Sequence, residues 1–232
     1  MTGLAEFLQN NLGHVAPIIL VGIFGFAIIL ERIKALYLSY PISNEEAFFE
    51  KIREMILVGE VAEAVTLCDQ HSGKPVATVV KRGLLRAHQP ENLVENGLEL
   101  AIEDASQTIS KRTSYLSMIA NVATLLGLLG TIAGLVKSFR AVGAADAATK
   151  SALLAQGIAE AMYATMFGLG VAIPCMIAFS FLMNRSNRLI SRTESAGVRV
   201  MDILKQRYFA AETKVNASSS GSNQNRDSTG IA

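Results

Sequence analysis

The sequence is poor in the side chains that catalysis and metal binding most often use. Its 232 residues include no Trp, two Cys, three His and five Pro, and only 18% of them are charged. Cys68 lies in a polar region and Cys175 in an apolar run, so the two are expected to act as small packing residues rather than to pair. Neither a disulfide framework nor a metal-ligand cluster is therefore predicted. The formal net charge of +1 gives no indication of a nucleic-acid partner.

Catalytic motifs are also missing from the sequence. The segment around Gly134 and Lys137 resembles a phosphate-binding loop, but a Walker loop needs Gly directly before Lys, and these two residues are separated. Gly73 does precede Lys74, but Pro75 follows instead of Ser or Thr. There is no paired-carboxylate arrangement of the kind used in general acid–base catalysis, no His cluster and no nucleophile elbow. We therefore expect no enzymatic activity and no cofactor.

What the sequence has in abundance is apolar residues. They make up 50% of the chain, and the mean hydropathy is +0.34, which indicates a polytopic membrane protein with some aqueous mass. A helix needs about 20 apolar residues to cross a bilayer core of roughly 30 Å. Three runs are long enough, and the sequence predicts transmembrane helices at 15–34, 113–136 and 152–184. The expected fold class is all-α, with long helices extending into the cytoplasm.

The remaining segments are polar. Apolar residues at helical spacing predict a small cytoplasmic helical domain at 35–112, in which Ser43 suits the N-cap of a capping box and Gly59 ends the first helix. No helix stop separates Pro90 from Val136, so one continuous helix of roughly 70 Å is predicted there. The other predicted segments are a periplasmic or interfacial N-terminus (1–14), a periplasmic connection (137–151), a cytoplasmic C-terminal helix (185–211) and a disordered Ser- and Asn-rich tail (212–232).

The positive charges predict the orientation of these helices. No Lys or Arg precedes the first span, several follow it, three lie in 137–151 and eight follow the third span. By the positive-inside rule, the N-terminus and the 137–151 connection lie outside, and the helical domain and the C-terminus lie in the cytoplasm.

Small residues recur along one side of the second and third spans. Gly130-x-x-x-Gly134 is a spacing typical of closely packed membrane helices, and glycine in a helix needs such a reason because it weakens the helix. Pro174 removes a backbone hydrogen bond in the third span and is expected to kink or loosen it. The residues predicted to serve helix packing are Gly127, Gly130, Gly134, Gly157, Gly168 and Pro174.

Three polar residues in these spans are candidates for function. Glu160 is the single charged residue of Ala152–Met183, and an ionisable group in a membrane span indicates a functional site, unless it only anchors the helix at the interface. Thr131, Glu160 and Thr165 lie at a similar depth if the two spans are antiparallel neighbours, although a buried threonine often bonds to its own helix. Together the three could line a narrow polar path. No carboxylate lies at the membrane midplane, so a complete ion path needs an acidic group from another chain.

These segments resemble the MotA/TolQ/ExbB proton channel family, and within it the TolQ/ExbB-like branch. The resemblance rests on Glu31-Arg32 at the end of the first span, on LGLLGTIAGLVKSF at 126–139, and above all on QGIAEAMYATMFGLGVAIPCMIAF at 156–179. The last segment contains a Gly-Ile-Ala-Glu-Ala run followed by Ala-Thr, Gly-Leu and Ala-Ile-Pro, as the family pattern does. Three spans and a long cytoplasmic loop agree with the family.

The resemblance implies a multi-pass protein of the bacterial inner membrane that forms an oligomeric ring, usually a homopentamer, in contact with membrane lipids. It implies a single-span partner of the ExbD/TolR kind, whose transmembrane Asp supplies the missing carboxylate, and a TonB/TolA-like protein as a further partner. Proton or sodium flow would then drive mechanical work in the periplasm or outer membrane, such as TonB-dependent uptake, Tol-type envelope maintenance or gliding. Thr131 and Thr165 would line the ring interior, and Glu160 would act in ion entry or ring packing.

Two other function classes stay open on the sequence. A membrane scaffold would dock other proteins through its helical domain without conducting ions, and a passive channel would conduct without a partner. For the ion-driven motor, we expect Thr165→Val and Glu160→Gln each to abolish activity and to leave assembly intact. In a scaffold the same substitutions would impair assembly instead.

Overall fold

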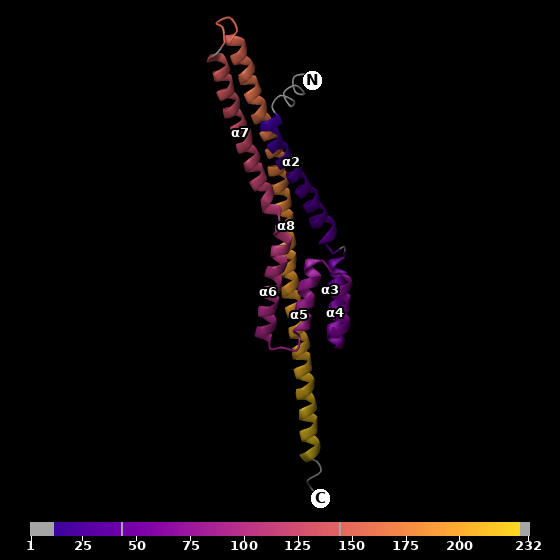
Figure 1. The fold of residues 1–232 in the computed structure, drawn as a ribbon. Coiled ribbons are helices and arrows are strands. Elements are labelled where there is room, and N and C mark those ends of the chain that lie inside the picture. Colours follow the sequence, from indigo (N-terminus) through magenta and orange to yellow (C-terminus); the bar gives the residue numbers. More distant parts are fainter. Residues whose placement is uncertain (1–11, 43, 144, 228–232) are drawn as a thin grey trace. The chain divides into compact units, whose positions relative to one another are not determined.

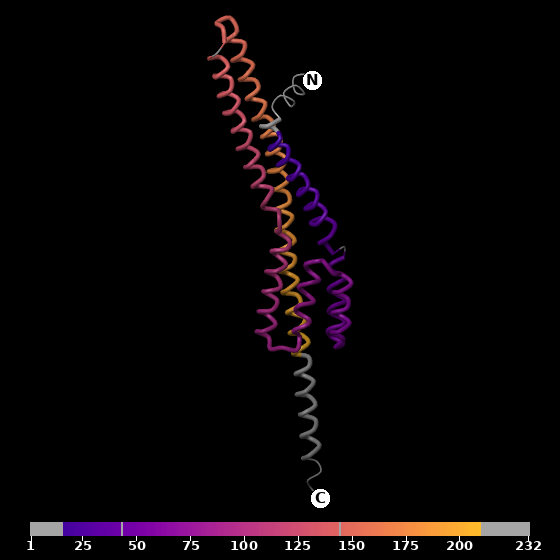
Figure 2. The backbone as a smooth tube through the Cα atoms, viewed as in Figure 1, coloured from indigo at the N-terminus to yellow at the C-terminus, as the bar shows by residue number. Residues whose placement is uncertain are grey.

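In a computed structural model, the chain folds into helices that form two compact units (Figures 1 and 2). The structure describes residues 12–42, 44–143 and 145–227, and among these it places the side chains of residues 16–209. Unit 1 contains the residues up to Leu36 together with Ser110–Ser186, and unit 2 contains Tyr37–Ile109 and the residues from Asn187 onward. Every regular element among the described residues is helical, which confirms the predicted all-α class. The prediction for segment 1–14 falls almost entirely outside the described residues.

Unit 1 is built from α2 (Leu12–Ile33), α7 (Thr113–Gly143) and the first part of α8 (Lys150–Asp227). Helix α2 is followed by a π-helix, η1 (Lys34–Ser39). Three helical segments are long and apolar enough to cross a membrane, which confirms the three predicted spans. They are Ala16–Ser39, Glu91–Gly143 and Lys150–Phe209.

The loop between the second and third spans is shorter than the sequence suggests. Helix α7 continues to Gly143 and α8 begins at Lys150, so helix occupies much of the segment 137–151 that was expected to be a connection. The uncharged run ends at Val136, but the backbone hydrogen bonds of a helix do not require an apolar side chain at every position.

The prediction of one continuous helix from Pro90 to Val136 is wrong, because the structure contains a break between two helices. Helix α6 (Glu91–Ser110) ends before α7 begins, and Lys111 and Arg112 form a turn between them. Arg112 has a φ of 64°, a left-handed conformation that is uncommon for a residue other than glycine. The sequence contains no glycine or proline at this point that would have indicated the break.

Contacts with the end of α2 stabilise this turn within unit 1. Arg32 is 3% exposed, and its Nη1 donates to the Lys111 carbonyl oxygen at 2.6 Å. A carbonyl group at the end of a helix has no intrahelical donor, and this charged donor supplies one. Arg112 Nη1 donates to Glu31 Oε1 at 2.7 Å. The Glu31-Arg32 pair therefore stabilises the turn at Lys111 and Arg112.

Unit 2 has its own apolar core between short helices, namely α3 (Glu45–Val58), α4 (Val61–Gln70), α5 (Pro75–Leu85), α6 and the later part of α8. The N-cap of α3 is Asn44, whose side chain accepts a hydrogen bond from the Ala47 amide at 3.3 Å. The N-cap is therefore one residue later than Ser43, where the sequence predicted it. Ser43 itself lies outside the described residues. Gly59 ends α3 in the left-handed region with a φ of 100°, as predicted. The principal core residues are Phe48, Phe49, Ile52, Ile56, Cys68, Val80, Leu84 and Val200.

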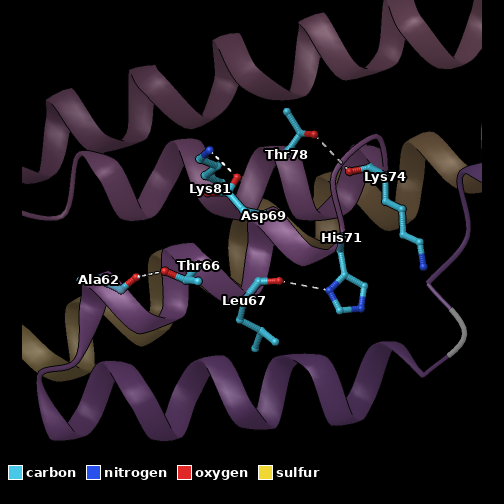
Figure 3. A network of polar contacts seen from close by, with 8 residues as sticks. All are labelled: Ala62, Thr66, Leu67, Asp69, His71, Lys74, Thr78 and Lys81. Carbon is cyan, nitrogen blue, oxygen red and sulfur yellow. Dashed lines mark hydrogen bonds and ion pairs between the residues drawn. The ribbon is translucent and has the colours of Figure 1, made fainter.

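Polar contacts around α4 and α5 serve local structure. Figure 3 shows the Lys81–Asp69 ion pair and the His71 ring, whose Nδ1 lies 3.1 Å from the Leu67 carbonyl oxygen. Exposed ion pairs of this kind contribute little to stability. Cys68 is buried close by, and burial raises the pKa of its thiol to about 12, so the thiol stays protonated and packs as an apolar group.

The C-terminal part of α8 also departs from the sequence prediction. The helix runs to Asp227, although 212–232 was expected to be a disordered tail. An established helix can continue past its last packed residue, because each added residue is fixed by one further hydrogen bond without a new nucleation step. The side chains from 210 onward and residues 228–232 lie outside the described part of the chain.

Candidate functional site

Glycines bring α7 and α8 into backbone contact in unit 1, where the two helices lie side by side (Figure 1). A Cβ atom at Gly168 would lie 2.7 Å from the Ala123 carbonyl oxygen and 2.8 Å from the Gly127 Cα. A Cβ atom at Gly127 would lie 3.1 Å from the Gly168 Cα. At this approach neither position has room for a side chain, as is typical of small-residue contacts between membrane helices.

The other predicted packing glycines lie at the same helix pair. A Cβ atom at Gly130 would lie 2.7 Å from the Ala164 Cβ, and one at Gly134 would lie 3.0 Å from the Ala161 Cβ. Gly157 faces Ser138, whose hydroxyl donates to the Gly134 carbonyl at 2.8 Å. Pro174 is exposed, and α8 is continuous through it.

The close approach places two hydroxyl groups in contact. Thr131 Oγ1 on α7 lies 2.5 Å from Thr165 Oγ1 on α8. Both hydroxyls also reach the Gly127 carbonyl oxygen, at 3.0 Å from Thr131 and 3.4 Å from Thr165. Thr131 therefore bonds to its own helix, as threonines in helices often do, and at the same time meets its counterpart across the helix pair.

This threonine pair has the chemistry of a hydrogen-bonding surface within an apolar wall. Both side chains are half-buried. Each hydroxyl can donate one proton and accept at its lone pairs. The pair therefore can stabilise a polar group brought to it from outside the chain.

Glu160 does not take part in the threonine contact. It is half-buried, and its Oε1 accepts from Gln156 Nε2 of the preceding turn at 3.4 Å. Five residues separate Glu160 from Thr165, which turns their directions about 140° apart around a helix of 3.6 residues per turn. The structure thus brings Thr131 and Thr165 together and leaves Glu160 on another flank of α8.

Helix α2 packs beside the α7–α8 pair through glycines that the sequence analysis did not single out. A Cβ atom at Gly22 would lie 3.0 Å from Val171 Cγ2. One at Gly25 would lie 3.0 Å from both Cys175 Sγ and Ile119 Cγ2. The spacing Gly22-x-x-Gly25 within the first apolar run was the available signal for this contact.

A groove on unit 1 adds two polar residues that the sequence analysis missed. Its volume is about 340 Å³, and its walls include Asn121 and Thr124 of α7. Both residues lie inside an uncharged run, and neither belongs to the motif-bearing segment 126–139 that contains Thr131. Among the residues that the structure describes, no group of three or more His, Cys, Asp or Glu could hold a metal ion.

The chain is similar in sequence to several known proteins. Residues 71–195 match the MotA/TolQ/ExbB proton channel family. The chain is 30% identical over 175 residues to a biopolymer transport protein ExbB homologue of Methanothermobacter thermautotrophicus, covering 75% of this chain and 61% of that protein. It is 35% identical over 119 residues to the Tol-Pal system protein TolQ of Pseudomonas aeruginosa, covering 51% of each chain.

A third relative is similar over more of its length. The biopolymer transport protein exbB1 of Vibrio cholerae is 26% identical over 193 residues, which cover 81% of this chain and 82% of that protein. The matches to the first two relatives cover less than two thirds of their lengths. The family match covers more than half of the 232 residues, and its range includes the threonine pair and the glycines around it. The chain is therefore a polytopic membrane protein that belongs to the MotA/TolQ/ExbB proton channel family, with TolQ/ExbB-like relatives.

Proposed function

We propose that this chain is the channel-forming subunit of an ion-driven motor in the inner membrane. It would assemble as a homopentameric ring, with its N-terminus in the periplasm and its C-terminus in the cytoplasm. Together with an ExbD/TolR-like single-span partner, it would couple the proton or sodium motive force to mechanical work. That work would be done in the periplasm or at the outer membrane, as in TonB-dependent uptake, Tol-type envelope maintenance or gliding, with a TonB/TolA-like protein as the recipient.

The contact between Thr131 and Thr165 is the observation that carries this proposal. It offers hydroxyls on one flank of two membrane helices, but these helices supply no carboxylate near the middle of the span. A partner's transmembrane Asp would complete the path. Protonated, that Asp could lie against a threonine-lined apolar wall; ionised, it could not remain there unpaired. The alternation between these two states would link ion flow to movement of the partner.

Native mass spectrometry of the complex, extracted gently from its own membranes, tests the composition that this function requires. We expect several copies of this chain to emerge together with a small single-span protein that carries an Asp in its transmembrane segment. Such a partner would also show, through its periplasmic domain, which process is energised. Recovery of the chain alone, or with soluble proteins only, would contradict the motor and favour a passive channel or a scaffold.

A further inference from the structure

An amide side chain lies deep in the second span. Asn121 is nine residues along α7 from Arg112, which corresponds to roughly 14 Å, or about half of a 30 Å hydrocarbon core. The side chain is exposed on the isolated chain and makes no hydrogen bond to any other described residue. An amide without a partner is costly in hydrocarbon, so this face of α7 must meet protein or water in the membrane.

Asn121 lies about 80° from Thr131 around α7 and roughly 15 Å from it along the helix axis. Thr124 connects the two, because it is seven residues from Thr131 and so lies about 20° from it around the helix and roughly 10 Å along it. Asn121 and Thr124 form the α7 wall of the groove of about 340 Å³, and Leu169, Ala172 and Met176 contribute to its α8 wall. The Thr124 hydroxyl donates to the Ala120 carbonyl at 3.0 Å, which leaves its lone pairs free to accept.

Helix α2 leaves this groove open. It packs against Val171 and Cys175 of α8 and Ile119 of α7, and none of these residues lines the groove. The groove wall that carries Asn121 and Thr124 therefore remains available to a neighbouring chain or to water after α2 has packed.

We propose that Asn121 and Thr124 form a second polar station of the ion path, in which they hold water in the groove between the threonine pair and the Thr113 end of α7. The Asn amide donates and accepts hydrogen bonds without changing its own protonation, so it orders the water that carries a proton or surrounds a sodium ion. This inference rests on the proposed function and extends it, because it gives the ion a route from the threonine pair toward the cytoplasmic side.

The test uses the complex purified with its membrane partner and reconstituted in liposomes that contain a pH-sensitive or a sodium-sensitive dye. A potassium diffusion potential drives uptake. We expect Asn121→Leu to lower the initial rate roughly ten-fold, as the loss of one buried polar interaction does, and Thr124→Val to lower it less. Asn121→Ser, which keeps a hydrogen-bonding group in the groove, should restore a large part of the rate. Asn184→Leu changes an exposed amide at the end of the third span that does not line the groove; it serves as the matched control and should leave the rate unchanged.

Thr165→Val, measured in parallel, separates this inference from the proposed function. If Thr165→Val loses uptake while Asn121→Leu keeps it, the second station is wrong and the threonine path stands. If Asn121→Leu prevents the ring from assembling, as judged by native mass spectrometry, Asn121 is an assembly contact and the inference is also overturned. If Asn121→Leu and Thr165→Val both lose uptake in intact rings and Asn121→Ser restores it, the second station is supported. If Thr165→Val keeps full uptake, the threonine path and the station that extends it are both overturned.

Discussion

Replacing Thr165 by valine is expected to abolish ion-driven uptake while the ring stays assembled. Valine matches threonine in shape, so the glycine contact between α7 and α8 is retained. The substitution removes the hydroxyl that lies 2.5 Å from Thr131 and 3.4 Å from the Gly127 carbonyl oxygen. In the proposed path this hydroxyl also meets the partner's Asp, and the loss of a hydrogen bond to such a group costs about 1.5–3 kcal/mol, or roughly ten- to a hundred-fold in rate. Dye-based uptake into liposomes that contain the reconstituted complex measures this loss.

A matched control distinguishes the path from a general effect of losing a hydroxyl. Thr108 on α6 makes the same local bond, from Oγ1 to the Asp104 carbonyl at 2.9 Å, but is exposed in unit 2. Thr108→Val should therefore leave uptake unchanged, and Thr131→Val should reproduce the loss caused by Thr165→Val. Full uptake in both threonine-pair variants would overturn the assignment. Glu160→Gln then tests the other flank of α8 separately, because Glu160 makes no contact with the pair.

Replacing Gly168 by valine is expected to cause the largest loss of assembly. The new Cβ would lie 2.7 Å from the Ala123 carbonyl oxygen and 2.8 Å from the Gly127 Cα, and both are backbone atoms that no rotamer change can move. The helices must then separate, which breaks the close packing that associates them in a membrane. Overpacking usually costs about 1–3 kcal/mol, and a contact with rigid backbone belongs at the upper end of that range or beyond. The yield and thermal stability of the extracted complex, followed by size-exclusion chromatography, measure the effect.

Gly170 provides the control two residues away on the same helix. A Cβ atom there has nothing within 4 Å, so Gly170→Val should extract and assemble as the unmodified chain does. The contact between α7 and α8 would lose its assigned importance if the Gly168 and Gly170 variants were equally stable. The threonine variants should differ from Gly168→Val in kind, since they lose uptake and keep the assembly.

Local sequence signals were enough to predict the helices of this protein but not its helix break. The three spans follow from run length, and Gly59 ends α3 because only a residue tolerant of left-handed geometry suits that position. The break at Lys111 and Arg112 has no such signal. It depends on Glu31 and Arg32, which lie about 80 residues earlier in the chain and meet this turn only in the folded state.

The polar residues of the spans illustrate a second limit of sequence analysis. The depth of a residue along a helix can be counted from the sequence. This count predicted that Thr131 and Thr165 lie at a similar depth, and the structure has their side chains in contact. Direction around the helix was not considered, and it separates Glu160 from Thr165. Asn121 lies outside the motif-bearing segments 126–139 and 156–179, although an uncharged amide in hydrocarbon also needs a partner.

The most direct test of the motor is ion uptake by the reconstituted chain with and without its membrane partner. The account predicts that liposomes containing the complex take up protons or sodium ions when a potential is applied. Uptake should stop when the partner is omitted, or when the Asp in the partner's transmembrane segment is replaced by Asn. Equal uptake by this chain alone would contradict the account, because the missing carboxylate would then not be needed and the chain would be a passive channel.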